Sequence, residues 1–161
     1  MRLVRVGAVG REVPAVLDER DVAHSLEGQP DFPALAASPE ALDGVRQALA
    51  AGGLPVLGPL ASLGRVGSPV PRPGKIVCVG LNYRDHARET GARLPSEPVL
   101  FLKGTDTMIG PYDEVLVPRG SQKTDWEVEL GVVVGRQARY LASPDEARAH
   151  VLGFAVSHDV S

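Results

Sequence analysis

The sequence is poor in cysteine, in aromatic residues and in long apolar runs. Among its 161 residues there is one cysteine, Cys78, which excludes an internal disulfide and fits a reducing compartment, so we expect a cytoplasmic protein. Only 4% of the residues are aromatic, which argues against a surface that stacks nucleic-acid bases. No apolar run approaches the roughly 20 residues that span a membrane, and the N-terminus lacks a signal-peptide core.

The chain also has little excess of either positive or negative charge. The formal net charge of −3 at pH 7 gives no reason to expect a nucleic acid or an anionic membrane as a partner. Hydrophobic residues make up 43% of the chain, which is enough for a packed core. The length suits one domain, or a small domain with part of a larger one.

Two short alternating segments open the chain. Residues 1–7 and 12–17 predict the two strands of a hairpin, with glycines in the turn between them. Pro14 within the second strand suggests an edge position, because proline donates no ladder hydrogen bond.

A helix and a linker follow the hairpin. Ser38 is placed as an N-cap and Pro39 as the first residue of a helix that a pair of glycines ends. Residues 54–74 are rich in glycine and proline and predict a linker or an extended wrap. We therefore expect a small N-terminal domain over residues 1–70 and a second domain over residues 71–161.

The second part begins with two apolar strands that flank a helix. Residues 75–81 and 98–103 predict the strands, and Asn82 is the expected N-cap of the helix. His86 and Glu89 lie three residues apart, hence on one face of that helix. Because a carboxylate can orient a histidine, they are a candidate acid/base pair, with an ordinary surface contact as the alternative.

The central stretch of the chain, residues 125–135, alternates with a period of two, as a half-buried β-strand does. One side carries apolar residues and the other carries acids, among them Glu127 and Glu129. These two glutamates point the same way, roughly 6.6 Å apart at about 3.3 Å per residue. A hard divalent cation would relieve their repulsion; the alternative is a solvated strand face.

Residues 153–161 predict the last strand, with Asp159 on its small, polar side and His158 on its apolar side. We expect His158 to be a core histidine. Together with Glu127 and Glu129, Asp159 forms an all-oxygen set that favours Mg²⁺, Mn²⁺ or Ca²⁺ over zinc. Spacing alone does not show whether the two strands are neighbours.

Five ordered motifs between residues 74 and 161 together resemble the fumarylacetoacetate hydrolase family. They are GKIVCVGLNYRDHARETG, EPVLFLKG, GPYDEVLVP, SQKTDWEVELGVVVG and HVLGFAVSHDVS. The fourth is nearest to bacterial members that act on 2,4-diketo-3-deoxy sugar acids and to ureidoglycolate lyase-like members. The resemblance implies an α+β fold, mainly β: part of a β-sandwich-like roll after a small N-terminal α/β domain.

The resemblance also implies roles for the candidate residues. Glu127 and Glu129 of its ExE motif, with Asp159 of its closing DVS motif, would hold Mg²⁺ or Mn²⁺, with Ca²⁺ as a substitute in crystals. The cation would chelate the substrate's carboxylate and 2-oxo oxygens. His86 and Glu89, on a mobile helix, would activate a water that attacks the distal carbonyl.

The implied function is metal-dependent hydrolysis of a C–C bond in a 2,4-dioxo acid, of the acylpyruvate or diketo-deoxy sugar acid type. The partner is a small 2-oxo acid, and the expected assembly is a homodimer. Tyr83 and Lys103 are the candidates for substrate binding, although a lysine at a strand end can simply extend into solvent. A 2-oxo acid decarboxylase, isomerase or lyase on the same chelation chemistry, and a truncated non-catalytic chain, are the alternatives.

Three features depart from the family's pattern. His158 stands where asparagine is usual, and Asp106 stands where a small hydroxyl residue is common. An Arg-Asp-x-x-Gln run, a later lysine motif and glycine-rich substrate loops follow DVS in the family but are not in this sequence. We therefore expect that the chain ending at Ser161 is not a competent catalyst by itself. We also expect its open sheet edges and its apolar strand faces to cause association with other chains.

Overall fold

The computed structural model describes residues 1–29, 32, 35 and 38–161. The chain divides into two compact units: Met1–Pro69 with Gly110–Ser161, and Val70–Ile109. One division falls beside the predicted boundary near residue 70, and a single domain over residues 71–161 stays a prediction. As predicted, the described part is mixed α+β with mostly strand content, in three sheets.

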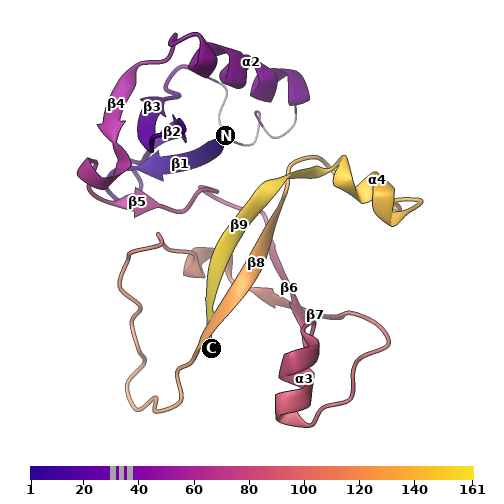
Figure 1. Ribbon diagram of the computed structural model, residues 1–161. Helices are drawn as coiled ribbons and strands as arrows, with labels where there is room; N and C mark the ends of the chain where they lie inside the picture. The colour runs from indigo at the N-terminus through magenta and orange to yellow at the C-terminus, as the bar shows by residue number, and fades with distance from the viewer. Residues whose placement is uncertain (30–31, 33–34, 36–37) are drawn as a thin grey trace. The chain divides into compact units, whose positions relative to one another are not determined.

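A five-stranded antiparallel sheet forms the N-terminal part of the first unit (Figure 1). The hairpin of β1 and β2 is present as predicted. The strand order is β4-β3-β2-β1-β5, and the five strands are β1 (Arg2–Val6), β2 (Val13–Leu17), β3 (Val22–Ser25), β4 (Val56–Pro59) and β5 (Val66–Gly67).

Helix α2, Pro39–Ala50, begins where the sequence predicts. Ser38 Oγ accepts a hydrogen bond from Ala41 N at 3.2 Å, and Pro39 lies in the first turn. The helix buries one side against the sheet, and the core cluster consists of Val16, Leu26, Leu35, Val45 and Leu54. This small domain thus has a core of its own.

The predicted edge position of Pro14 is wrong, because β2 lies between β1 and β3. The β2–β3 ladder includes Ala15 opposite Ser25, and beyond it Leu26 N donates to Pro14 O at 2.9 Å. The nitrogen and carbonyl of a strand residue point to the same side, so Pro14 lacks its donor toward Leu26. Leu26 O instead accepts a hydrogen bond from Gln29 N at 3.0 Å, and the sheet tolerates an interior proline.

The prediction of a linker over residues 54–74 is wrong for the first part of this segment. That first part contains β4 and β5, with a 3₁₀ turn, η1 (Leu60–Ser62), between them. β4 pairs with β3 and β5 pairs with β1, so both edges of the sheet come from this segment. Short strands rich in glycine and proline are tolerated at edges because one side of an edge strand needs no ladder partners.

The second unit contains β6 (Ile76–Gly80), helix α3 (Arg84–Thr90), β7 (Val99–Lys103) and a 3₁₀ turn, η2 (Thr105–Thr107). β6 and β7 pair antiparallel, from Ile76 opposite Lys103 to Gly80 opposite Val99. Both strands were predicted from their apolar sequences.

The start of α3 differs from the prediction. Its N-cap is Tyr83 rather than Asn82, and the cap has no side-chain hydrogen bond. The reason is the preceding turn: Leu81 has a φ of 52°, so the chain leaves the strand through a left-handed residue and enters the helix one position later. Gly91, with a φ of 65°, ends α3.

The first unit also contains a long antiparallel ribbon of β8 (Trp126–Val134) and β9 (Val151–Val160), joined through α4 (Pro144–Arg148) (Figure 1). Both strands were predicted. Their pairing is a result of the tertiary structure, and it brings the acidic residues of the two strands together. Among the described helices, none is both long and apolar enough to cross a bilayer.

Candidate metal and acid/base site

The register of the β8–β9 ribbon places three carboxylates on one face. Asp125 and Ser161 exchange two backbone hydrogen bonds, of 2.7 and 3.1 Å. Since such pairs alternate along an antiparallel ladder, Glu127 opposite Asp159 is again a hydrogen-bonded pair, with Cα atoms roughly 5.5 Å apart. Glu129 follows two residues on, opposite Ser157. Directly opposed residues share a face, so Glu127, Glu129 and Asp159 point the same way.

The surroundings of these carboxylates favour a positive partner. Glu127, Glu129 and Asp159 are all half-buried. Within the residues that the structure describes, the side chains of Glu127 and Glu129 have no hydrogen bond or ion pair. Two half-buried like charges on one strand face are unfavourable unless a cation joins them.

The donor set fits a hard divalent cation in its chemistry. In the described ranges, no group of three or more histidine, cysteine, aspartate or glutamate side chains is arranged closely enough to hold a metal ion as it stands. Glu127, Glu129 and Asp159 would hold the ion after rotation of side chains that share a face. Carboxylate oxygens suit Mg²⁺, Mn²⁺ or Ca²⁺ rather than zinc.

His86 and Glu89 lie on α3 as predicted, and both are exposed. Ala87, 2% exposed, is the buried residue of this helix. At 3.6 residues per turn, His86 and Glu89 lie about 100° and 160° around the helix from Ala87. They therefore share the side that faces away from the packing, where a substrate or a water can reach them.

Tyr83 and Lys103 are in the same compact unit as His86 and Glu89. Tyr83 is the N-cap of α3 and is 45% exposed. Lys103 is the last residue of β7 and is half-buried. The unit of Val70–Ile109 thus contains four of the seven predicted site residues, and the three carboxylates belong to the other unit.

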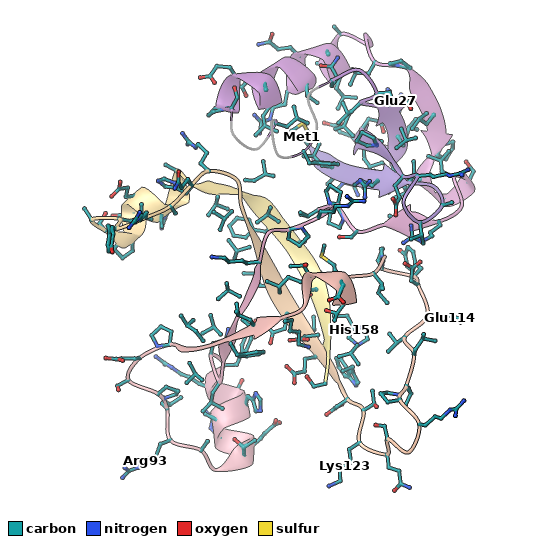
Figure 2. All side chains as sticks on the ribbon, turned by 180° about the vertical axis from the view of Figure 1, so that it is seen from behind. Met1, Glu27, Arg93, Glu114, Lys123 and His158 are labelled. Atoms are coloured by element: carbon teal, nitrogen blue, oxygen red, sulfur yellow. The ribbon has the colours of Figure 1, made fainter. Side chains whose placement is uncertain are left out.

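The other face of the ribbon is apolar and exposed, the reverse of the burial that the sequence predicts. Trp126 and Val128 on β8 are 69% and 67% exposed, and Val156 on β9 is 84% exposed. His158 lies on this face, opposite Val128 (Figure 2), and is itself exposed rather than a core histidine. A hollow of about 230 Å³ opens among these side chains.

Sequence reasoning missed Leu81, which turns the chain into α3. No local pattern marks it, because leucine is not a residue that a motif places at positive φ. The glycine before it, Gly80, is the residue that sequence reading would choose for such a turn.

A family model described as fumarylacetoacetate (FAA) hydrolase C-terminal matches residues 75–161, which is more than half of the chain. The chain belongs to the fumarylacetoacetate hydrolase family, as the motifs implied. Members of this family are enzymes that act on small molecules.

The curated relatives carry several activities. Mitochondrial oxaloacetate tautomerases of Bos taurus and Homo sapiens are each 52% identical over 94 residues, which is 58% of this chain and 30% of theirs. A protein of Burkholderia ambifaria, named only as a hydrolase, is 43% identical over 164 residues, covering 100% of this chain and 56% of its own. The match thus spans about half or less of these relatives' lengths.

Solved structures agree with the fold. A 5-carboxymethyl-2-hydroxymuconate delta-isomerase from Mycobacterium smegmatis has a TM-score of 0.68 at 25% identity, over 100% of this chain and 55% of its own. A fumarylacetoacetate hydrolase from Exiguobacterium antarcticum has a TM-score of 0.64 at 25% identity, over 99% and 56%. The expected fold class is therefore confirmed.

Proposed function

We propose that this chain carries the metal ligands and the acid/base pair of an enzyme that hydrolyses a C–C bond of a 2,4-dioxo acid, of the acylpyruvate or diketo-deoxy sugar acid type. The main support is the register of the ribbon. It sets Glu127 opposite Asp159, with Glu129 two residues on, and the half-buried Glu127 and Glu129 have no counter-charge among the residues that the structure describes.

Three residues would bind the cation. Glu127, Glu129 and Asp159 supply oxygen ligands for Mg²⁺ or Mn²⁺. When bound, the ion supplies a positive charge that stabilises the negative charge developing on a 2-oxo acid in the transition state.

The acid/base pair would carry the proton transfers. Glu89 orients His86, and an imidazole nitrogen of His86 takes a proton from water. The hydroxide attacks the distal carbonyl, the C–C bond to the 2-oxo acid part breaks, and its electron pair leaves as the enolate. The proton on His86 then returns to the enolate carbon, so that one carboxylic acid and one 2-oxo acid result.

Tyr83 and Lys103 are proposed to bind the substrate. Lys103 would pair with an anionic group of the acid, and the Tyr83 hydroxyl would donate a hydrogen bond. Their support is position: one begins the helix that carries His86, and the other ends the strand paired with β6.

An isomerase or tautomerase is the second candidate, and the 52% identity to oxaloacetate tautomerases favours it. That reaction moves a proton at the carbon beside the 2-oxo group and needs no water attack. His86 with Glu89 can move that proton as well, so the same residues serve both reactions. A decarboxylase or a lyase would use the same ligands.

We also propose a cytoplasmic homodimer. The support for the dimer is the exposed apolar surface of the paired strands, such as Leu102 at 69% and Leu130 at 61% exposure, which a second copy would cover. The support for the compartment is the single cysteine of the sequence.

The test is product analysis on an intact enzyme that includes this chain, with Mg²⁺ or Mn²⁺ present. An acylpyruvate should give pyruvate and a carboxylic acid in equal amounts, measured by NMR. Conversion of enol to keto oxaloacetate without any cleavage of acylpyruvate would replace the hydrolase with the tautomerase. Turnover of neither substrate, together with no Mn²⁺ binding by calorimetry, would reject both.

A further inference from the structure

A leucine with a left-handed backbone lies directly before the helix of the proposed acid/base pair. Leu81 has a φ of 52°; the other described non-glycine residues at positive φ are Asp21 and Tyr140. In this conformation the Cβ atom crowds the following carbonyl, so a branched apolar residue rarely adopts it. Such strain persists only where the surrounding structure holds it.

Leu81 opens the short connection from β6 to α3. It is the first residue after the β6–β7 ladder, whose end is Gly80 opposite Val99. Only residues 81–83 separate the strand from Arg84, the first residue of α3. With so short a connection, the backbone angles of residues 81–83 set the direction in which the helix leaves the strand, and Leu81 is the one of the three at positive φ.

The glycine next to it does not take the strained conformation. Gly80 is not among the glycines at positive φ, and a Cβ there would lie 3.6 Å from Phe101 Cε1 and Val99 Cγ1, an ordinary contact. Leu81 is half-buried, so its side chain is partly removed from water. The turn is thus formed by a half-buried leucine, rather than by the glycine that would adopt this conformation freely.

Helix α3 has few other anchors. It has seven residues, no side-chain hydrogen bond at its N-cap, and Ala87 as its buried residue. At its far end, Gly91 N donates to Arg88 O at 3.3 Å and Ala92 N donates to Ala87 O at 2.9 Å. In the N-terminal half, which contains His86, Ala87 N donates to Tyr83 O at 3.2 Å, so this half follows the direction of the chain that leaves the turn at Leu81.

We propose that Leu81 is a positioning residue: its left-handed backbone directs α3 so that His86 and Glu89 lie on the exposed side of the helix, away from the buried Ala87. The kinetic consequence rests on the proposed function, but the fixing of the helix does not. The two parts are tested separately.

Two substitutions separate the backbone from the side chain. Leu81→Val keeps an apolar side chain, but β-branching opposes the left-handed conformation. Leu81→Asn accepts that conformation and gives up the apolar side chain. Leu63→Val is the matched control, because Leu63 is also half-buried but has a φ of −89°.

The first readout is amide hydrogen exchange of α3, at Ala87, Gly91 and Ala92, whose N–H groups bond within or beside the helix. These amides should exchange faster in Leu81→Val and stay close to the unaltered protein in Leu81→Asn and Leu63→Val. Unchanged exchange in Leu81→Val, or equal acceleration in both Leu81 variants, overturns the proposal. If Leu81→Val does not fold, Leu81→Ala replaces it. Exchange of these amides in Leu81→Ala that is no faster than in Leu81→Asn then overturns the proposal.

The second readout is steady-state kinetics with the substrate that the protein turns over. A displacement of about 1 Å at a catalytic group can cost about 100-fold in rate, so Leu81→Val should lower kcat by about 10- to 100-fold without changing Mn²⁺ affinity. Leu81→Asn should keep most of the kcat of the unaltered protein. Faster exchange of α3 in a protein that turns over neither substrate would reject the proposed function and leave the positioning of α3 supported.

Discussion

Arg65 donates two parallel hydrogen bonds to Asp113, from Nε to Oδ1 at 2.7 Å and from Nη2 to Oδ2 at 2.6 Å. Its Nη1 donates to Glu12 Oε1 at 2.8 Å and to Gly7 O at 3.2 Å. Asp113 also accepts from Gly110 N at 2.7 Å. One guanidinium therefore joins the β1–β2 connection, the start of β5 and the turn that follows the second unit.

The charges of this cluster support one another. Hydrogen bonding to Asp113 and Glu12 raises the pKa of Arg65. The bonds from Arg65 and then Gly110 N lower the pKa of Asp113. Burial raises the pKa of Glu12, but hydrogen bonds from its backbone and from Arg65, with the charges of Arg5 and Arg65, outweigh it and lower the pKa overall.

Removal of Arg65 should destabilise the protein. In Arg65→Met, Glu12, which is 7% exposed in the unaltered protein, loses its closest cation, and a buried acceptor without its donor is unfavourable. We expect a lower urea midpoint of unfolding. Arg46→Met is the matched control, because the Arg46–Asp43 pair is 55% and 61% exposed and exposed pairs contribute little. Equal midpoints in the two variants would contradict the prediction.

The stability that the ion pairs of Arg65 with Glu12 and Asp113 contribute should decrease in acid. The pKa values of Glu12 and Asp113 lie below their ordinary 4.5 and 3.8, so the unfolded chain binds more protons as the pH falls. The stabilisation is complete above those ordinary values and is lost as the pH falls through the folded-state pKa values. Urea midpoints of the unaltered protein and Arg65→Met should therefore converge on acidification, and a constant difference would refute this.

Metal binding should depend on the acidic face of the ribbon. Glu127→Gln should weaken Mn²⁺ binding by about tenfold or more, since the loss of even outer-shell partners costs about 10- to 100-fold. Glu97→Gln, which removes an exposed acid elsewhere, should bind as the unaltered protein does in calorimetry. With metal bound, oxygens of Glu127, Glu129 and Asp159 should lie about 2.0–2.6 Å from the ion. Side chains that point to different surfaces would exclude the site.

In an intact enzyme, His86→Ala should lower kcat by about 10²- to 10⁴-fold, as expected for the loss of a general base. The affinity for Mn²⁺ should barely change, because His86 is not among the proposed ligands. Arg88→Ala is the control on the same helix: Arg88 is 80% exposed and pairs with Asp85 at 3.2 Å. A fully active His86→Ala protein would reduce the His86–Glu89 pair to a surface contact.

The 161-residue chain should associate through the apolar face of the ribbon. Trp126 is the one tryptophan of the sequence and is 69% exposed, so its emission should shift to the blue as the concentration rises. Val128→Lys should weaken association on a sizing column, whereas Val9→Lys, at a valine 76% exposed outside the ribbon, should not. A monomer at all concentrations would be evidence against the proposed dimer.

Local physics explains why much of the fold was predictable. The period of two in β8 follows from strand geometry, and it placed Glu127 and Glu129 on one face before any partner strand was known. Ser38 and Pro39 marked the start of α2 because an N-cap acts within one turn. Each of these features depends on neighbours in sequence.

The failed predictions depend on distant residues. Pro14 lies in an interior strand because Gln29 N satisfies the carbonyl of Leu26, which no local rule supplies. The strands within residues 54–67 form because the edges of an existing sheet accept them.

The sequence by itself determined the family, the kinds of residue at the proposed site and the faces that they occupy, because motifs and strand period are local properties. Only the tertiary structure decided that Glu127 lies opposite Asp159, that Leu81 turns left-handed and that Arg65 joins Glu12 to Asp113. Pairing, strain and ion clusters arise where the free energy of long-range contacts outweighs local preference.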